Sequence, residues 1–388
     1  MPRDTVPSDS PRRRRALECA GARGDVLEEL LAYGAPLVAV EQAVAVAVAV
    51  AAAEMPDEPQ VAAWTRYADE ARQMGAIAAL SRVFPQLRYP IVKGISETDG
   101  YRAATRRGIP PNNDEAATGL PISRPDLVTL EIHETLSGRV PLIVASDRGD
   151  FEALVRAMSA RNEPVEVPAS MGACLVRGLT DWDRVRRFRK QWEASHPSTS
   201  WDVGFQELVP QRELYQVRFV ILSSGPYSGL PAKESGFSED EWLAASFTIR
   251  REHEMTHYFT LRVAGITRNN LVDELIADFV ALVRTFGLYR EELALRFMGL
   301  EAFPAYRHGA RLENYRGNPP LSDPAFELAR RLVHAAVKGL SLLDANRPAS
   351  SRTENGLALL VLGLTTLGLE ELALPDLLGL LPPWAVRP

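Results

Sequence analysis

The sequence predicts an α+β protein in which helical regions at both ends of the chain enclose a mixed middle region. Three observations support this prediction. Residues from about 24 to 107 read as helices, the stretch 127–222 alternates strand-like and helical patterns, and no convincing strand follows Ser238. With 388 residues and 46% hydrophobic side chains, the chain is long enough to bury a sizeable core, as two domains.

The first third is predicted to contain a disordered leader and then a layer of helices. Residues 1–23 are rich in Pro, Ser and Arg and lack an apolar stretch, which is typical of a solvated tail. Helices are expected over 25–33, 38–54 and 60–83. The apolar run at 43–53 falls well short of the roughly 20 residues that span a bilayer, so it predicts a buried helix.

A domain boundary is expected near residue 120. The stretch 108–125 is rich in proline, asparagine and glycine, which is the composition of a linker or an extended loop. We therefore expect a helical N-terminal region over 24–120 and a second domain over 121–388.

The second domain is predicted to begin as mixed α and β structure and to end as helices. Strands are expected over 127–133, 140–145, 164–176 and 215–222, with helices over 150–161 and 182–192. Further helices are expected over 239–264, 269–286, 289–299, 323–344 and 356–368. The fold class is therefore α+β, with a mixed α/β middle region and a helical C-terminal part.

Charge and cysteine content exclude several classes of protein. A net charge of −6 gives no general electrostatic reason to bind nucleic acid or an anionic membrane, and no segment is predicted to span a membrane. The chain has two cysteines, Cys19 and Cys174, which excludes a disulfide framework and favours a reducing compartment. We expect a cytoplasmic protein.

The most informative motif is H-E-x-x-H, formed by His253, Glu254 and His257. On a helix, residues four apart lie one turn apart on the same side, so both imidazoles can bind one cation while Glu254 lies beside its open position. The two histidines share a helix face with Ile249 and Leu261, so they interrupt an otherwise apolar stripe. The chain has only six histidines, which makes a chance occurrence of this motif improbable.

The helix that carries the motif is expected to lead into a second helix. Gly265 suits the left-handed geometry of a C-terminal cap after a helix over 239–264. Thr267, Asn269 or Asn270 can cap the next helix. The two helices therefore form an αα-hairpin.

The second arm of this hairpin offers two carboxylates on a largely apolar face. Glu274 and Asp278 are four residues apart and share a stripe with Leu271 and Leu282. Burying an unpaired carboxylate destabilises the fold by several kcal/mol or shifts the pKa of the group. A metal ion opposite Glu274 and Asp278 would therefore explain why two carboxylates lie on an apolar face. Glu274 then completes a His2Glu site, and Asp278 accepts the other ring N–H of a ligating histidine.

Residues 250–284 resemble the gluzincin class of zinc metallopeptidases, in which an H-E-x-x-H helix is followed by a helix with E-x-x-x-D. The matching residues are His253, Glu254, His257, Glu274 and Asp278. The resemblance covers this segment alone. It implies a catalytic Zn²⁺ held by His253, His257 and Glu274, with Glu254 as the general base on the metal-bound water.

The resemblance also implies a zincin-like fold for residues 121–388. The strand expected at 215–222 sits where a zincin fold usually supplies its substrate-binding edge strand, although sequence order does not show which strand lies at an edge. Asp273 stands where the family often has asparagine, so Asp273 is an alternative third ligand.

The resemblance implies a metallopeptidase-like enzyme, a zinc-dependent hydrolase of a peptide or amide bond, with a peptide or small amide as its substrate. His308, Arg311 and Tyr315 are spaced at i, i+3 and i+7, and we expect one of them, His308 or Tyr315 in particular, to stabilise the oxyanion. The alternative for the last two is that Arg311 pairs with a glutamate and Tyr315 packs in the core.

Three other interpretations of the motif stay open. Two histidines and one carboxylate also form the facial triad of non-haem iron(II) oxygenases, in which Glu254 is not needed as a base. The protein can also be a scaffold that binds metal without turnover. Finally, His253 and His257 can be core histidines bonded to backbone, with Glu254 paired to Arg250 one turn back.

Overall fold

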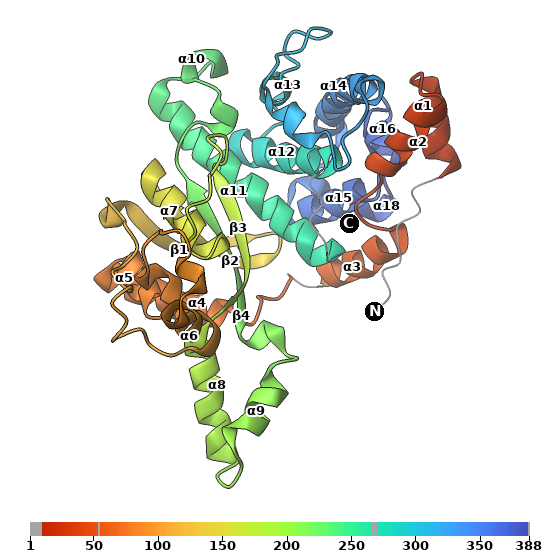
Figure 1. The fold of residues 1–388 in the computed structure, drawn as a ribbon. Coiled ribbons are helices and arrows are strands. Elements are labelled where there is room, and N and C mark those ends of the chain that lie inside the picture. Colours follow the sequence, from red (N-terminus) through yellow and green to blue (C-terminus); the bar gives the residue numbers. More distant parts are fainter. Residues whose placement is uncertain (1–9, 53–54, 266–269, 387–388) are drawn as a thin grey trace. The chain divides into compact units, whose positions relative to one another are not determined.

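The computed structural model describes residues 10–52, 55–265 and 270–386, and the fold is mixed α+β (Figure 1). The chain divides into two compact units, one made of residues 56–225 and the other made of both ends of the chain, 1–55 and 226–388. The expected single boundary near residue 120 does not coincide with this division. The boundary proposed from composition lies inside the first of these units, and both ends of the chain fold together.

The unit formed by residues 56–225 contains a four-stranded sheet in the order β1-β2-β4-β3. Its strands are β1 (Val128–Thr135), β2 (Gly138–Ala145), β3 (Ala173–Thr180) and β4 (Gln216–Ser223). β1 and β2 form an antiparallel hairpin, β4 runs parallel to β2, and β3 runs antiparallel to β4. β4 therefore lies between two partners and cannot serve as the expected edge strand. Its almost continuous burial from Val217 onward is typical of a central strand.

The same unit contains six described helices, some of which cover one face of the sheet. They are α4 (Val61–Met74), α5 (Ala76–Ser81), α6 (Asp99–Arg107), α7 (Arg148–Ser159), α8 (Trp182–Ser195) and α9 (Trp201–Leu208). α4, α5 and α7 contribute to one apolar core with the sheet, in which the ring centroids of Trp64 and Phe219 are 4.8 Å apart. The expected helix over 60–83 is broken at Gly75, whose φ of +87° ends α4. α8 and α9 form a hairpin that extends away from the sheet (Figure 1).

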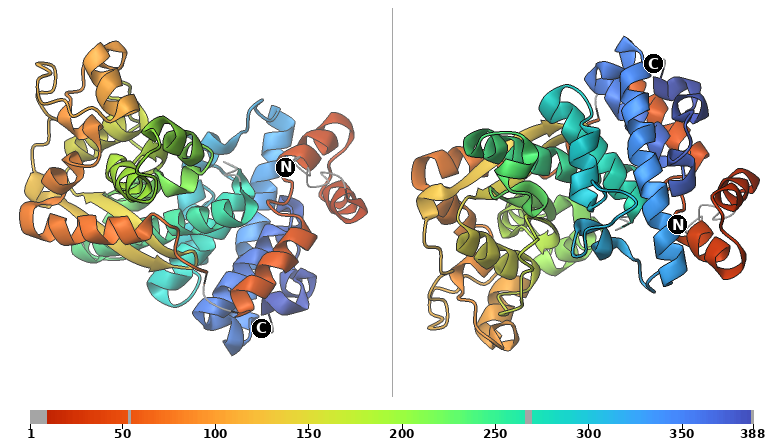
Figure 2. Two further views of the ribbon diagram at one scale, coloured as in Figure 1. Left: turned by 90° about the horizontal axis from the view of Figure 1, so that it is seen from below. Right: turned by 90° about the horizontal axis from the view of Figure 1, so that it is seen from above.

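The unit formed by both ends of the chain contains helices and connecting turns but no strand in its described residues. Its helices are α1 (Pro11–Cys19), α2 (Gly24–Tyr33), α3 (Val40–Ala52), α10 (Ala232–Ser235), α11 (Glu239–Ala264), α12 (Leu271–Phe286), α13 (Glu291–Met298), α14 (Asp323–Asn346), α15 (Glu354–Thr365), α16 (Leu369–Leu372), α17 (Leu377–Leu380) and α18 (Pro383–Val386). α11 packs along α12, and α14 packs against α16 and α17 (Figure 2). This arrangement places the H-E-x-x-H helix beside α12 in the helical unit.

The apolar helices α3 and α15 explain why the two ends of the chain meet. α15 is buried at every position from Gly356 to Thr365, so it needs cover on all sides. α3 supplies part of this cover, with Ala43, Ala47 and Val50 buried. Across the three described stretches of the chain, no helix has both the length and the apolar composition to cross a bilayer.

The expected disordered leader is wrong over its described residues. Residues 1–9 lie outside those that the structure describes, but α1 follows them, with the Ser10 side chain accepting a hydrogen bond from the Arg13 N–H at 3.2 Å. Arg13 is buried and forms an ion pair with the equally buried Glu370 of α16, while Arg12 pairs with Glu371 at 2.5 Å. The carboxylates that order these arginines lie more than 350 residues away in the sequence, so local composition could not show them.

Candidate metal centre

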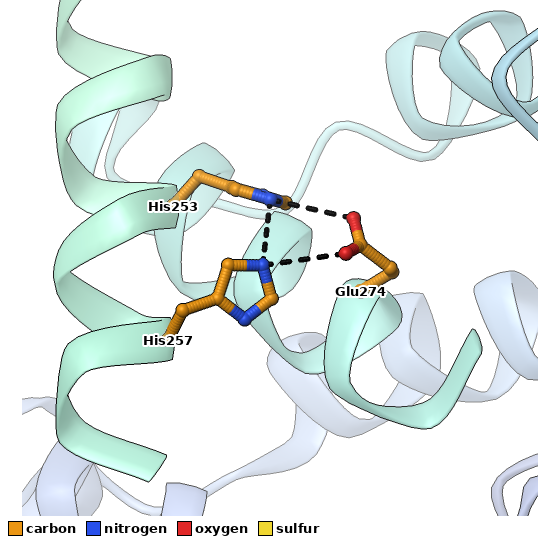
Figure 3. Close-up of side chains that lie close together, drawn as sticks. All are labelled: His253, His257 and Glu274. Atoms are coloured by element: carbon orange, nitrogen blue, oxygen red, sulfur yellow. Dashed lines mark hydrogen bonds and ion pairs between the residues drawn. The ribbon is translucent and has the colours of Figure 1, made fainter. Parts of the chain in front are cut away.

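α11 carries the two histidines, and its bounds match the range expected from the sequence. Ser238 caps its N-terminus in a capping box, since the Glu241 N–H donates to Ser238 Oγ at 3.4 Å and the Ser238 N–H donates to Glu241 Oε2 at 3.0 Å. Gly265, with a φ of +71°, ends the helix as expected. Between these caps, His253 and His257 project from consecutive turns toward α12 (Figure 3).

α12 brings Glu274 to the two imidazoles. Asn270 caps this helix, its side chain accepting a hydrogen bond from the Asp273 N–H at 3.1 Å. Thr267 and Asn269, the other two residues expected as caps, lie outside the described residues.

The three expected ligands converge on one point (Figure 3). The Nε2 atoms of His253 and His257 are 3.0 Å apart. Glu274 Oε2 lies 3.4 Å from His253 Nε2, and Glu274 Oε1 lies 3.4 Å from His257 Nε2. One ligand atom from each residue lies within 4.8 Å of the others, which is a spacing that one metal ion can bridge. The structure therefore brings together the His2Glu set that the sequence indicated.

The Nδ1 atom of each histidine, on the far side of the ring from Glu274, contacts a further carboxylate. Asp278 Oδ1 lies 3.0 Å from His253 Nδ1, as expected. Asp273 Oδ2 lies 3.2 Å from His257 Nδ1, on the opposite side of that ring from Glu274, and Asp273 Oδ1 accepts a hydrogen bond from Thr260 at 3.1 Å. In this geometry Asp273 contacts the ring nitrogen of His257 that faces away from Glu274. Both rings are oriented with Nε2 toward the common point.

Tyr227 and Arg311 extend this arrangement behind His253. The Tyr227 hydroxyl donates to Asp278 Oδ1 at 2.9 Å and lies 3.0 Å from His253 Nδ1. Arg311 Nη1 donates to the same hydroxyl at 2.7 Å, and Nη2 pairs with Asp278 Oδ2. Sequence reasoning missed Tyr227, which lies in a Gly/Pro-rich loop without periodic pattern. It expected Arg311 either at the substrate or paired with a glutamate, whereas Arg311 pairs with an aspartate.

The two other residues expected near the substrate have different positions. The Tyr315 hydroxyl donates to Glu274 Oε2 at 2.8 Å, so it contacts a ligand. His308 is 92% exposed, and its Nδ1 lies 3.4 Å from Glu313, so His308 does not belong to the centre and its expected role is wrong. The expectation assumed a helical spacing, but residues 301–310 form turns and only a short 3-10 helix, Arg311–Tyr315, follows them.

Glu254 lies next to His253 on α11 and is partly exposed. Among the residues that the structure describes, it has no hydrogen-bond or ion-pair partner, whereas Arg250 donates to the Pro226 carbonyl at 3.2 Å. The alternative pairing of Glu254 with Arg250 is thus not formed.

The electrostatics of the centre favour charge on the ligand side chains. Burial disfavours the charged form of His257, but the carboxylates of Asp273 and Glu274 outweigh it and raise the pKa of His257 well above its usual range. Burial also disfavours the ionised form of Glu274, but His257 and His253 outweigh it and hold the pKa of Glu274 well below its usual range. Without metal, the centre is therefore a buried ion pair between imidazolium and carboxylate.

This pairing predicts that metal binding releases protons. Because the pKa of His257 is raised, its ring is protonated at neutral pH in the metal-free protein, and a metal ion must displace that proton. The apparent affinity should rise with pH until the pH passes the raised pKa, and fall as the pH is lowered. Calorimetric titration with Zn²⁺ in two buffers of different ionisation enthalpy measures the number of protons released. Identical heats in both buffers would contradict this assignment.

The carboxylates behind the histidines should tune affinity without abolishing it. Replacement of such a partner typically weakens metal binding by about 10–100-fold. We expect Asp273→Asn to raise the Zn²⁺ dissociation constant within that range, and Asp278→Asn to do the same, measured by competition with a chromogenic chelator. If Asp273→Asn removed the metal altogether while Glu274→Gln kept it, Asp273 would be the third ligand after all.

Comparisons with known proteins give the family of the chain. No curated protein and no solved structure matches it. A family model does match, over residues 15–376, which includes the candidate metal centre and most of both units. On that match, the chain belongs to a family of unknown function, DUF7005.

Proposed function

We propose that the protein is a zinc-dependent hydrolase of a peptide or amide bond, with Glu254 as its general base and the cytoplasm as its compartment. The observation that carries the proposal is that His253 Nε2, His257 Nε2 and the Glu274 carboxylate lie within 4.8 Å of one another. The Nδ1 atoms of His253 and His257 contact the carboxylates of Asp278 and Asp273. This is a metal-ligand arrangement in which the tautomer of each histidine is set by a carboxylate.

The chemistry of the donor set fits zinc. Two imidazole nitrogens and one carboxylate are ligands that zinc accepts, and catalytic zinc sites typically use three protein ligands, whereas structural sites use four. The group found in the described part of the chain has three members. His253 and Glu274 are buried, and an ion between them balances the charge of the carboxylate without the need for a protonated ring.

The residues around the ligands have separable tasks in this proposal. When bound, zinc would supply Lewis acidity and lower the pKa of a water at its open position to about 7. The Glu254 carboxylate would take a proton from the attacking water and deliver it to the leaving nitrogen. Tyr315 would hold Glu274 in place through its hydroxyl, which stays protonated because burial raises its pKa.

A zincin-like fold for the helical unit is part of the same proposal. It is supported by the H-E-x-x-H helix α11 and by α12, which presents Glu274 and Asp278 one turn apart. The alternative function, a non-haem iron(II) oxygenase, uses the same three ligands but does not need Glu254 as a general base. The non-catalytic scaffold predicts metal binding without turnover.

The proposal is tested with the full chain loaded with Zn²⁺ and incubated with a mixture of internally quenched peptides and N-acyl amino-acid amides. We expect hydrolysis that 1,10-phenanthroline stops and added Zn²⁺ restores. Absence of cleavage by protein with a full equivalent of zinc would contradict a hydrolase and favour the scaffold. Oxygen consumption by the Fe²⁺-loaded protein, with no hydrolysis by the zinc form, would favour the oxygenase.

A further inference from the structure

A second site is indicated at the edge of the sheet, in the unit formed by residues 56–225. β3 pairs with β4 alone among the described strands, so one side of β3 is a free edge. The register between β3 and β4 shifts between Arg177 and Leu179, around Gly178 with its φ of +81°. A bulge of this kind re-aims side chains at the end of a strand, and a free edge can accept an added strand.

A cavity of about 390 Å³ lies against this part of β3. Its lining includes residues 175–179 of β3, the apolar Met158 at the C-terminal end of α7, and the guanidinium-bearing Arg161 and Arg177. Both arginines are exposed, and neither forms an ion pair with a residue that the structure describes. The cavity thus joins an apolar wall, a strand edge and two positive charges without acidic partners.

Gln86 supplies an independent sign of a ligand. Its side chain lines the same cavity and the residue is only 7% exposed. Within the described chain, its Oε1 atom has no hydrogen-bond partner. Buried polar atoms without partners are rare in folded proteins, and a bound group that donates a hydrogen bond is one explanation for such an atom. The Oε1 atom at this position can accept a hydrogen bond from a backbone N–H of a ligand.

Arg161 is held in place by the backbone at the end of α7. Arg161 has a φ of +55°, in the left-handed region that favours glycine. The next residue, Asn162, shares this conformation, but asparagine tolerates it and Asn162 is fixed by side-chain hydrogen bonds to the carbonyls of Gln86 and Tyr89. The left-handed conformation of Arg161 closes the C-terminus of α7, where the Asn162 N–H donates to the Arg156 carbonyl at 3.0 Å, and the Arg161 side chain forms no ion pair with a described residue.

We propose that this cavity binds an extended peptide segment that adds to the free edge of β3 and places a carboxylate between Arg161 and Arg177. The strand edge supplies backbone hydrogen bonds, the apolar wall accepts alternate side chains, and the guanidinium groups recognise the carboxylate in a fork geometry. The carboxylate comes from an acidic side chain or from the C-terminus of the peptide. This site is independent of the metal centre, so its failure would leave the proposed hydrolase untouched.

The test measures fluorescence anisotropy of a fluorescein-labelled peptide of alternating valine and threonine that ends in glutamate with a free C-terminus, titrated with the full chain. We expect Arg177→Ala and Arg161→Gly each to raise the dissociation constant about tenfold. Arg161→Gly is the sharper variant, because glycine suits the positive φ and the thermal midpoint should not fall. Arg186→Ala, which removes an exposed arginine of α8 outside the cavity, should leave the affinity unchanged.

Three altered peptides separate the parts of the proposal. A C-terminal amide and a glutamine in place of the glutamate show which carboxylate is recognised. A peptide with both changes should bind to wild type at least as weakly as the charged peptide binds to Arg177→Ala. A peptide N-methylated at alternate amides should lose affinity by a comparable factor. Equal affinity of wild type and Arg177→Ala, equal binding of the N-methylated peptide, or no binding at about 1 mM would overturn the proposal.

Discussion

Glu254→Gln should reduce the turnover of peptide or amide substrates by about 10²–10⁴-fold, while the protein keeps its full metal content. Glutamine preserves the shape of the side chain but cannot accept the proton of the attacking water, and a loss of this size is typical when a general base is removed. Glu254 has no partner within the described residues, so its replacement removes no contact that holds the fold. Steady-state kinetics and metal analysis of the same preparation check both parts.

The control for this variant is Glu241→Gln on the same helix. Glu241 belongs to the capping box at the start of α11, three turns before the histidines. Glutamine can still accept the hydrogen bond from the Ser238 N–H, so this variant should keep the helix and wild-type turnover. If Glu254→Gln kept wild-type turnover, Glu254 would not be the base, whatever the metal content.

Glu274→Gln should produce the opposite pattern, with loss of metal first and loss of activity as its consequence. Structural zinc sites with four protein ligands bind with about 10–16 kcal/mol, so one ligand accounts for roughly 2.5–4 kcal/mol. We therefore expect the Zn²⁺ dissociation constant to rise by about two to three orders of magnitude. Competition with a chromogenic chelator measures this directly.

Glu274→Gln also removes the acceptor of the Tyr315 hydroxyl and the charge that faces both imidazoles. The pKa of His257 should therefore fall toward its usual range, because one of the carboxylates that raise it is lost. Tyr315→Phe separates the two effects, since it removes the hydrogen bond and keeps the ligand. We expect it to weaken metal binding by no more than about tenfold, and a loss as large as that of Glu274→Gln would show that Tyr315 is itself a ligand.

The helices that carry the metal centre could be predicted from the sequence because their signals are local. Ser238 and Gly265 delimit α11, and Asn270 caps α12. The spacing of His253 and His257 fixes their common face once the helix is assigned. Short-range rules therefore suffice for the two arms of the hairpin and for the ligands that face each other across it.

The rest of the centre depends on contacts that cross long stretches of sequence. Tyr227 and Arg311 reach Asp278 from loops 51 and 33 residues away, and neither loop has a periodic pattern that indicates a direction. The expected role of His308 failed for the same reason, since a helical spacing was assumed where the chain forms turns. The ordering of α1 by Glu370 and the division into two units likewise arise from pairings between the two ends of the chain.

The central claim is that His253, His257 and Glu274 hold one metal ion, and metal content tests it most directly. The full chain, purified without added metal and without metal-affinity resin, should contain about one equivalent of zinc by inductively coupled plasma mass spectrometry. The double variant His253→Ala/His257→Ala, with an unchanged fold by circular dichroism, should contain none. Full metal content in the double variant, or no zinc uptake by the wild-type chain even after dialysis against Zn²⁺, would contradict the assignment of the centre.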